Sequence, residues 1–168
     1  MALLDILKYP DEALKQLSES VAEFDDELHS FLVDLEDTMR AGPGGVGIAA
    51  PQVGYFKRIA IVDVSSRPKI EHNGCMILIN PEIKTWDGMK VGREGCMSVP
   101  DYTGNVIRAE KITLQAYNAR GEQQDYECTG YEARAVQHEL DHLDGLLFLD
   151  RLVSRRTDLF KRKTYHKK

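Results

Sequence analysis

The sequence predicts a single α+β domain in which mostly antiparallel strands surround one helix of the C-terminal third. Strand-like segments follow one another along the middle of the chain, and helical patterns are confined to its beginning and end. No repeat, low-complexity stretch or linker divides the 168 residues, a length typical of one domain. We expect residues 1–150 to form the body, and residues 151–168 to extend the same domain as a basic helix.

The N-terminal helix is predicted from apolar residues at helical spacing, which should form one buried face. Acidic residues 25–27 complement the dipole of its first turn, and Arg40 complements the dipole of its last turn. Gly42-Pro43 should end it. The apolar residues are Leu28, Phe31, Leu32, Leu35 and Met39.

Four strands are predicted next. Residues 59–64, apolar except for Asp63, are typical of a buried strand, and the apolar residues 75–79 form another that Asn80-Pro81 should close. Residues 111–117 alternate apolar and polar side chains, and residues 118–121 have the composition of a hairpin turn. The strand after this turn should end near Cys128.

The last predicted helix begins at a capping-box pattern formed by Thr129 and Glu132, and Gly145 should end it. Its periodicity gives two stripes of side chains. One is apolar and should face the core: Ala133, Val136, Leu140 and Leu143. The other is offset around the helix: Tyr131, Ala135, His138 and His142.

Composition narrows the class of protein. Hydrophobic residues make up 42% and charged residues 29%, as in soluble globular proteins, and no apolar run approaches the roughly 20 residues of a membrane span. The N-terminus lacks the pattern of a signal peptide, so we expect a cytoplasmic protein without membrane contact. Three cysteines, an odd number, favour free thiols. Cys75 and Cys128 fit small buried side chains.

Charge is distributed unevenly along the chain. Residues 151–168 carry eight basic side chains against one acid, which is +7, whereas the net charge of −5 leaves −12 for the rest. Such a tail suits a polyanionic partner, and it equally suits a solvated or packed helix. The sequence leaves both open.

His138 and His142 are spaced i, i+4, which places both imidazoles on one helix face where they can share a metal ion. Glu139 lies beside them and can act as a general acid and base. The alternative is a polar helix face with two solvent-exposed histidines. A catalytic site of this kind usually has three protein ligands. Cys96, beside Gly95 in a predicted loop or strand end, is the candidate for the third.

Residues 44–52 are rich in glycine. No Lys-Ser/Thr follows the glycines, which disfavours a phosphate-binding loop. A strand-like rim that lets a ligand come close fits better. Gln52 at its end can donate an amide N–H to a developing oxyanion.

Three segments together resemble the signature motifs of the peptide deformylases. Residues 45–52 read Gly-Val-Gly-Ile-Ala-Ala-Pro-Gln against Gly-x-Gly-x-Ala-Ala-x-Gln. Residues 94–98 read Glu-Gly-Cys-Met-Ser, with Met in place of the family's Leu, and residues 137–142 match Gln-His-Glu-x-Asp-His. Residues 4–11 are similar to the family's N-terminus.

The resemblance implies removal of the formyl group from the N-terminal N-formylmethionine of nascent polypeptides, with release of formate. It implies one divalent metal ion held by Cys96, His138 and His142. The native metal would be Fe(II), with Zn, Ni or Co as substitutes. It also implies that Gln52 and the backbone N–H of Met97 stabilise the oxyanion. The helix predicted between Thr129 and Gly145 would then be the metal-binding one.

Substrate contacts are expected along the glycine-rich segment and in an apolar pocket for the methionine side chain. The peptide backbone would lie along the edge formed by Gly45, Val46, Gly47 and Ile48. Tyr131 and Ala135 share the helix stripe of the two histidines and, with Val46 and Ile48, are candidates for the wall of the methionine pocket. The basic tail is a candidate for contact with the ribosome, and a monomer is expected.

Three alternatives remain at this point. A zinc metallopeptidase with the same His-Glu-x-x-His segment would take a downstream third ligand, for which Asp150 and His166 are available, but neither lies in a matching motif. A deformylase-like protein without catalysis would bind only chain ends or metal. A structural zinc site would usually be closed by four ligands.

Overall fold

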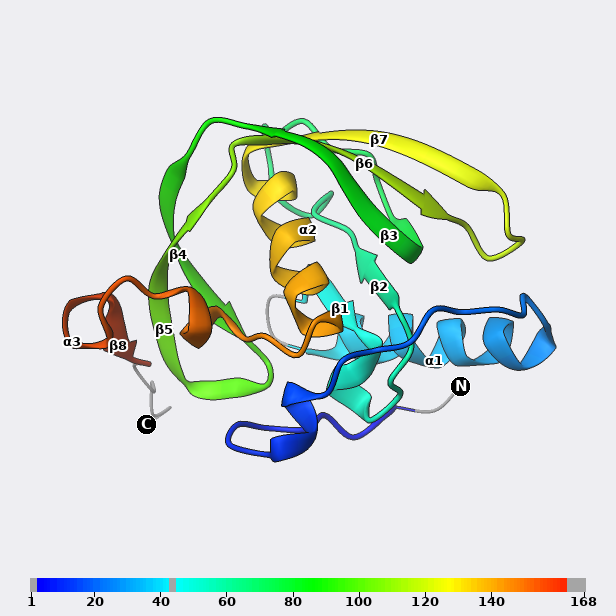
Figure 1. The fold of residues 1–168 in the computed structure, drawn as a ribbon, viewed down its shortest axis with the longest axis horizontal. Coiled ribbons are helices and arrows are strands. Elements are labelled where there is room, and N and C mark those ends of the chain that lie inside the picture. The colour runs from blue at the N-terminus through cyan, green and yellow to red at the C-terminus, as the bar shows by residue number, and fades with distance from the viewer. Residues whose placement is uncertain (1–2, 43–44, 163–168) are drawn as a thin grey trace.

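The computed structural model describes residues 3–42 and 45–162. Two antiparallel sheets flank one buried helix, α2 (Gly130–Leu143), which lies in the angle between them (Figure 1). This confirms the predicted α+β domain. The larger sheet has the strand order β1-β2-β3-β6-β7, and the smaller has the order β4-β5-β8. The strands are β1 (Gly47–Ala49), β2 (Ile59–Val62), β3 (Met76–Asp87), β4 (Lys90–Cys96), β5 (Val99–Arg108), β6 (Lys111–Tyr117), β7 (Gln123–Thr129) and β8 (Leu159–Lys161).

Helix α1 (Asp26–Ala41) confirms the predicted N-terminal helix. Asp25 caps it, because its carboxylate accepts a hydrogen bond from the Leu28 N–H at 2.9 Å. The helix ends at Gly42. Its apolar face forms a core cluster with one face of β1 and β2 and with residues around them. The helix thereby supports β1, the strand that borders the site described below. The buried members of the cluster are Leu28, Leu32, Leu35, Met39, Ile48, Ala50, Ile59, Ile61 and Ile79.

The predicted end of a strand at Asn80-Pro81 is wrong, because β3 continues to Asp87. Asn80 adopts a left-handed φ of 51°, and the pairing with β6 shifts register between Ile79 and Glu82. Such a bulge accommodates a proline that has no N–H to donate. The Asn80 side chain exchanges two hydrogen bonds with the backbone of Val21, at 2.8 and 3.0 Å. The strand at residues 111–117 and the turn after it are confirmed.

Helix α2 begins where predicted, but the capping box does not form. Thr129 is the N-cap residue without a side-chain hydrogen bond. Glu132 instead accepts two hydrogen bonds from Asn73, at 2.7 Å from its N–H and 2.6 Å from its side-chain amide. The Glu132 carboxylate therefore binds Asn73, which is distant in the sequence, and does not cap the start of α2 as the local pattern predicted. The apolar stripe of α2 is buried in the core, as predicted.

Gly145 ends α2 as predicted, in a left-handed conformation with φ 75°. A Cβ at this position would overlap the carbonyl oxygen of Lys15.

We expect Gly145→Ala to lower the free energy of unfolding by about 3 kcal/mol or more, since it adds a backbone clash to the cost of positive φ. Gly74→Ala is the matched control, because Gly74 has φ 70° and nothing within 4 Å of its Cβ position. That control should lose only about 1 kcal/mol. Urea unfolding measures both, and equal losses would contradict the clash.

Of the two cysteines predicted to be buried, Cys75 and Cys128, only Cys128 is buried. Cys128 is fully buried in the core, as predicted. Cys75 is exposed and lies just before β3, so its assignment as a buried side chain is wrong. The strand begins one residue later than the predicted start at Cys75, at Met76.

The C-terminal segment contains a basic helix, α3 (Arg155–Asp158), of only four residues. The chain then pairs as β8 with β5, so the expectation of a basic helix over residues 151–168 is wrong for residues 159–161. Leu152 and Leu159 pack against the cluster that contains Phe148, which explains why this segment folds back. Basic residues 163, 167 and 168 lie outside the described residues. Within the described part, no helix has the length and apolar composition to span a membrane.

Candidate active site

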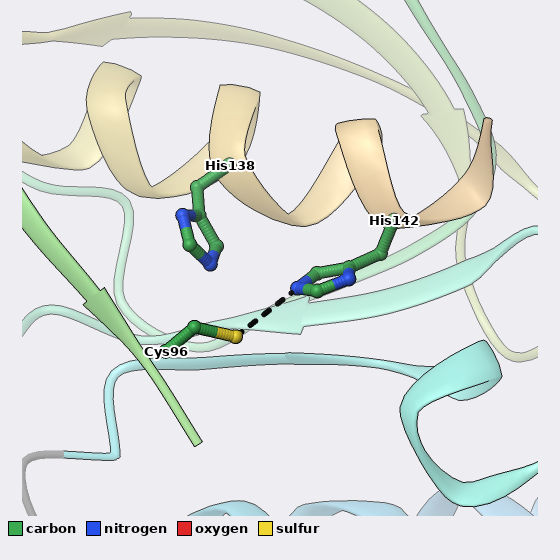
Figure 2. Close-up of side chains that lie close together, drawn as sticks. All are labelled: Cys96, His138 and His142. Atoms are coloured by element: carbon green, nitrogen blue, oxygen red, sulfur yellow. Dashed lines mark hydrogen bonds between the residues drawn. The ribbon is translucent and has the colours of Figure 1, made fainter. Parts of the chain in front are cut away.

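Cys96, His138 and His142 meet at the centre of the molecule. Cys96 ends β4, and the two histidines project toward it from consecutive turns of α2 (Figure 2). Their potential ligand atoms all lie within 4.8 Å of one another, and Cys96 Sγ is 3.4 Å from His142 Nε2. All three side chains are buried. The structure therefore brings together the three residues that the sequence predicted as ligands, across 46 residues of chain between Cys96 and His142.

This cluster fits a divalent metal ion that accepts sulfur and nitrogen ligands. Among residues 3–42 and 45–162, it is the one group of three or more His, Cys, Asp or Glu side chains close enough to share an ion. Three protein ligands of this kind would hold a metal while leaving a position for water or substrate, as in catalytic metal sites. Cys96 and His138 line a cavity of about 780 Å³, so a substrate can reach this position.

Glu94 holds the His138 ring in place. Its carboxylate lies 2.8 Å from His138 Nδ1 and also accepts hydrogen bonds from Arg108 and Arg134. Arg108 in turn bonds Asp141 at 2.6 Å. Burial alone would raise the pKa of Glu94, but the hydrogen bonds from His138 and Arg108 lower it well below its usual range. Glu94 is therefore ionised and favours a proton on Nδ1, which leaves His138 Nε2 for a metal. Sequence reasoning assigned Glu94 no role, although it lies inside a matched motif.

Glu139 lies at the edge of the same centre. Its Oε1 is 4.0 Å from His142 Nε2 and, among the described residues, has no hydrogen-bond partner although it is buried. Burial raises its pKa to about 7. Gly47 makes room for it, because a Cβ there would lie 2.5 Å from Glu139 Oε2. A buried carboxyl group that titrates near neutral pH and has an unpartnered oxygen can both accept and return a proton.

Gln52 is fixed next to Cys96 by the short helix η2 (Ala50–Val53). Its Oε1 accepts the Ala49 N–H at 2.9 Å, which settles the orientation of the amide. Its Nε2 donates to Ser98 Oγ at 3.0 Å and contacts Cys96 Sγ at 3.5 Å. One hydrogen of this amide therefore makes only a weak contact, with sulfur. Met97 follows Cys96 directly, and its side chain packs against the cluster that contains α1.

The predicted substrate residues do not all line the cavity. Gly45, Val46, Gly47, Tyr131 and Ala135 line it, together with Met97, Gln52 and Glu139. Ile48 does not; it is fully buried against the α1 cluster. The reason is strand alternation, because neighbouring residues of β1 face opposite sides.

Several basic side chains also line the cavity, and none was predicted to do so. Arg67 lies over the Tyr131 ring at 4.3 Å and donates to its hydroxyl at 3.1 Å. Arg134 lies against Gly92, where a Cβ would be 2.7 Å from its guanidinium carbon. No local pattern marks these residues, since they reach the cavity from separate elements. The basic lining residues are Lys8, Arg67, Arg93, Arg134 and Arg162.

Comparison with known proteins gives consistent results. The family model described as polypeptide deformylase matches residues 3–158. A peptide deformylase of Thermodesulfovibrio yellowstonii is 40% identical over 168 residues, which cover 100% of both chains. A peptide deformylase structure from Thermotoga maritima superimposes with TM-score 0.84 at 36% identity and covers 92% of this chain and 100% of its own. A Met-Ala-Ser-bound class I type b peptide deformylase from Acinetobacter baumannii has TM-score 0.83 at 35% identity, with 90% and 99% covered.

Proposed function

The chain belongs to the peptide deformylase family, and we propose that Cys96, His138 and His142 bind its metal while Glu139 transfers protons. The enzyme removes the formyl group from the N-terminus of newly made polypeptides. The observation that supports the assignment of residues is the cluster of one thiol and two imidazoles within 4.8 Å, beside a buried carboxyl group.

We propose Fe(II) as the native metal because the chain belongs to this family, with Zn, Ni or Co as substitutes, since imidazole and thiolate ligands suit all four ions. A divalent metal held by these side chains supplies Lewis-acid chemistry, which allows water to ionise near neutral pH. Glu94 orients His138 for metal binding, because its carboxylate lies 2.8 Å from His138 Nδ1.

Three residues around the metal site have successive roles in the reaction. Glu139 accepts a proton from the attacking water and returns it to the leaving amine at the methionine nitrogen. Negative charge develops on the formyl oxygen during attack. Gln52 Nε2, 3.5 Å from Cys96 Sγ, and the backbone N–H of Met97 donate hydrogen bonds to this oxygen.

Substrate binding uses the free edge of the larger sheet. Strand β1 ends the strand order and pairs only with β2 among the described strands, so its other edge can accept an extended peptide beside Gly45, Val46 and Gly47. The methionine side chain enters the cavity beside Tyr131 and Ala135. The Met-Ala-Ser-bound relative from Acinetobacter baumannii supports peptide binding by such a fold.

Formate release from a short N-formylmethionyl peptide, measured with air excluded, tests this function. Formate should appear with the deformylated peptide in equal amounts. Cleavage of internal peptide bonds without formate would favour the metallopeptidase alternative, and tight peptide binding without either product would favour a non-catalytic binding protein.

Oxygen should inactivate the iron form. A thiolate beside Fe(II) with an open coordination position is exposed to oxidation. We expect activity of the Fe(II)-loaded enzyme to decline in air while the Zn- and Ni-loaded forms keep theirs. Activity followed over hours, in air and under nitrogen, measures this. An iron form as durable in air as the nickel form would contradict the proposed Fe(II)–thiolate site.

We further propose that the basic C-terminal segment helps this cytoplasmic enzyme reach ribosomes, whose surface is rich in RNA phosphate. Arg155, Arg156 and Lys161 are exposed in the structure. Deletion of residues 163–168 removes three lysines and leaves β8 intact. The truncated enzyme should co-sediment with ribosomes more weakly and with less dependence on salt, because each lost phosphate contact reduces the salt slope by about one.

The control for this truncation replaces three exposed lysines elsewhere, Lys69, Lys84 and Lys111, with glutamine. It changes net charge equally and should leave co-sedimentation unaffected. If the truncated enzyme co-sediments as well as the full chain at every salt concentration, the segment does not dock there.

A further inference from the structure

The C-terminal strand β8 places one arginine at the active site. The three residue pairs of β8 with β5 and the hydrogen bond from the Arg162 N–H to the Asp101 carbonyl, at 2.8 Å, fix the course of this segment. The Phe160 ring adds an anchor, since the Arg93 guanidinium lies 3.7 Å over it. The segment lies beyond residue 158, where the match to the family model ends.

The Arg162 side chain crosses β4 next to the metal-binding cysteine. A Cβ at Gly95 would lie 2.7 Å from Arg162 Nη2, so the guanidinium rests directly on the glycine that precedes Cys96. Arg162 also lines the cavity that contains Cys96, His138 and Glu139. A residue of the tail therefore forms part of the wall around the reacting centre.

The Arg162 guanidinium lacks the partner that such a group normally has. Among the described residues its one hydrogen bond reaches the Tyr102 carbonyl at 3.5 Å, and no carboxylate pairs with it. Its Nε is buried without a partner. Arg108 and Arg134 are by contrast bonded to Glu94. A buried donor that stays unsatisfied costs free energy, so the arrangement favours an acceptor supplied from the cavity.

The charges around the cavity point to the same kind of acceptor. The protein has a net charge of −5, which disfavours acidic ligands in general. The cavity nevertheless has five basic lining residues against two acids, Glu94 and Glu139. The Glu94 carboxylate is already hydrogen-bonded to Arg108, Arg134 and His138, so it does not pair with Arg162.

We propose that Arg162 is a specificity-determining residue, whose guanidinium binds a carboxylate of the substrate peptide downstream of the formylmethionine. The inference rests on the proposed function, because the cavity is the one that receives the formyl peptide. The carboxylate belongs to an acidic side chain at the second or third position, or to the C-terminus of a very short peptide.

Paired peptides distinguish these sources. Formyl-Met-Glu-Ala-amide and formyl-Met-Ala-Glu-amide are each compared with the Gln counterpart, and formyl-Met-Ala-Ser is compared with its amide. For wild-type enzyme, kcat/KM should be about five- to tenfold higher for the acidic member of at least one pair, mainly through KM. The preference should shrink as salt is raised, because salt screens charge pairs.

Three variants complete the test. Arg162→Gln should abolish the preference, and Arg162→Lys should restore part of it, since lysine keeps the charge without the planar fork. Arg156→Gln removes the same charge from an exposed position of the same segment and should keep the preference. A wild-type enzyme without preference in any pair, or a preference that survives in Arg162→Gln, would overturn the inference alone. Absence of formate from every peptide would overturn the proposed function and this inference with it.

Discussion

Glu139→Ala and Glu139→Gln are each expected to lower turnover on an N-formylmethionyl peptide by about 10²-fold or more, the usual scale of general acid–base catalysis. Glutamine keeps the size of the buried side chain but cannot accept a proton. The carboxyl group is not one of the three clustered ligand residues, so metal content should stay close to that of wild type.

Turnover and metal content measured on the same preparations decide this role. Glu127→Gln is a suitable control, because Glu127 is an exposed carboxylate on β7, outside the cavity. A Glu139→Gln enzyme that binds metal and retains near-wild-type turnover would show that another group transfers the proton. A variant that loses metal along with activity would assign Glu139 to the metal site instead.

Cys96→Ser is expected to release the metal. Serine is a poor ligand, and its substitution removes one of three ligand atoms. The loss of affinity should exceed the roughly 10–100-fold typical of losing a hydrogen-bond partner of a ligand. Metal content after gel filtration, and affinity by competition with a chelator, measure it.

The other two cysteines provide matched controls. Cys75→Ser changes an exposed side chain and should alter neither metal content nor stability. Cys128→Ser places a hydroxyl in the core, where the native side chain is fully buried, and should lower the free energy of unfolding by about 1–3 kcal/mol without loss of metal. Equal metal retention by all three variants would remove Cys96 from the site.

Local patterns in the sequence predicted several features that the structure contains. The spacing of His138 and His142 needs only helical geometry to place both rings on one face, and the structure has them on consecutive turns of α2. The apolar residues of α1 and α2 repeat with the helical period, so their buried faces followed from the sequence. Cys96 was a candidate third ligand because of its residue type and its predicted loop or strand-end setting, and the resemblance to a family then assigned it to the same metal as the two histidines.

Features that join distant segments were decided by the tertiary structure. Glu94 meets His138 across 44 residues, and Arg108 meets Asp141 across 33. Asn73, 59 residues upstream, donates a hydrogen bond to Glu132, which the sequence predicted to form a capping box instead. In each case a buried charged or polar group took the partner that the fold brought within reach, and no local periodicity records which partner that is.

In the C-terminal segment, too, the sequence predicted one feature and the tertiary structure decided another. Its charge was evident from the sequence, and a helix was the natural expectation for an isolated basic stretch. Pairing with β5 satisfies the backbone of β8, while Leu152 and Leu159 gain contacts with the cluster around Phe148. The sequence by itself therefore determined which residues have the chemistry of a metal hydrolase, because ligand type and helical spacing are local. The tertiary structure decided which charges are neutralised, which strand edge stays open and where Arg162 lies, because these depend on distant groups that compete for the same burial and hydrogen bonds.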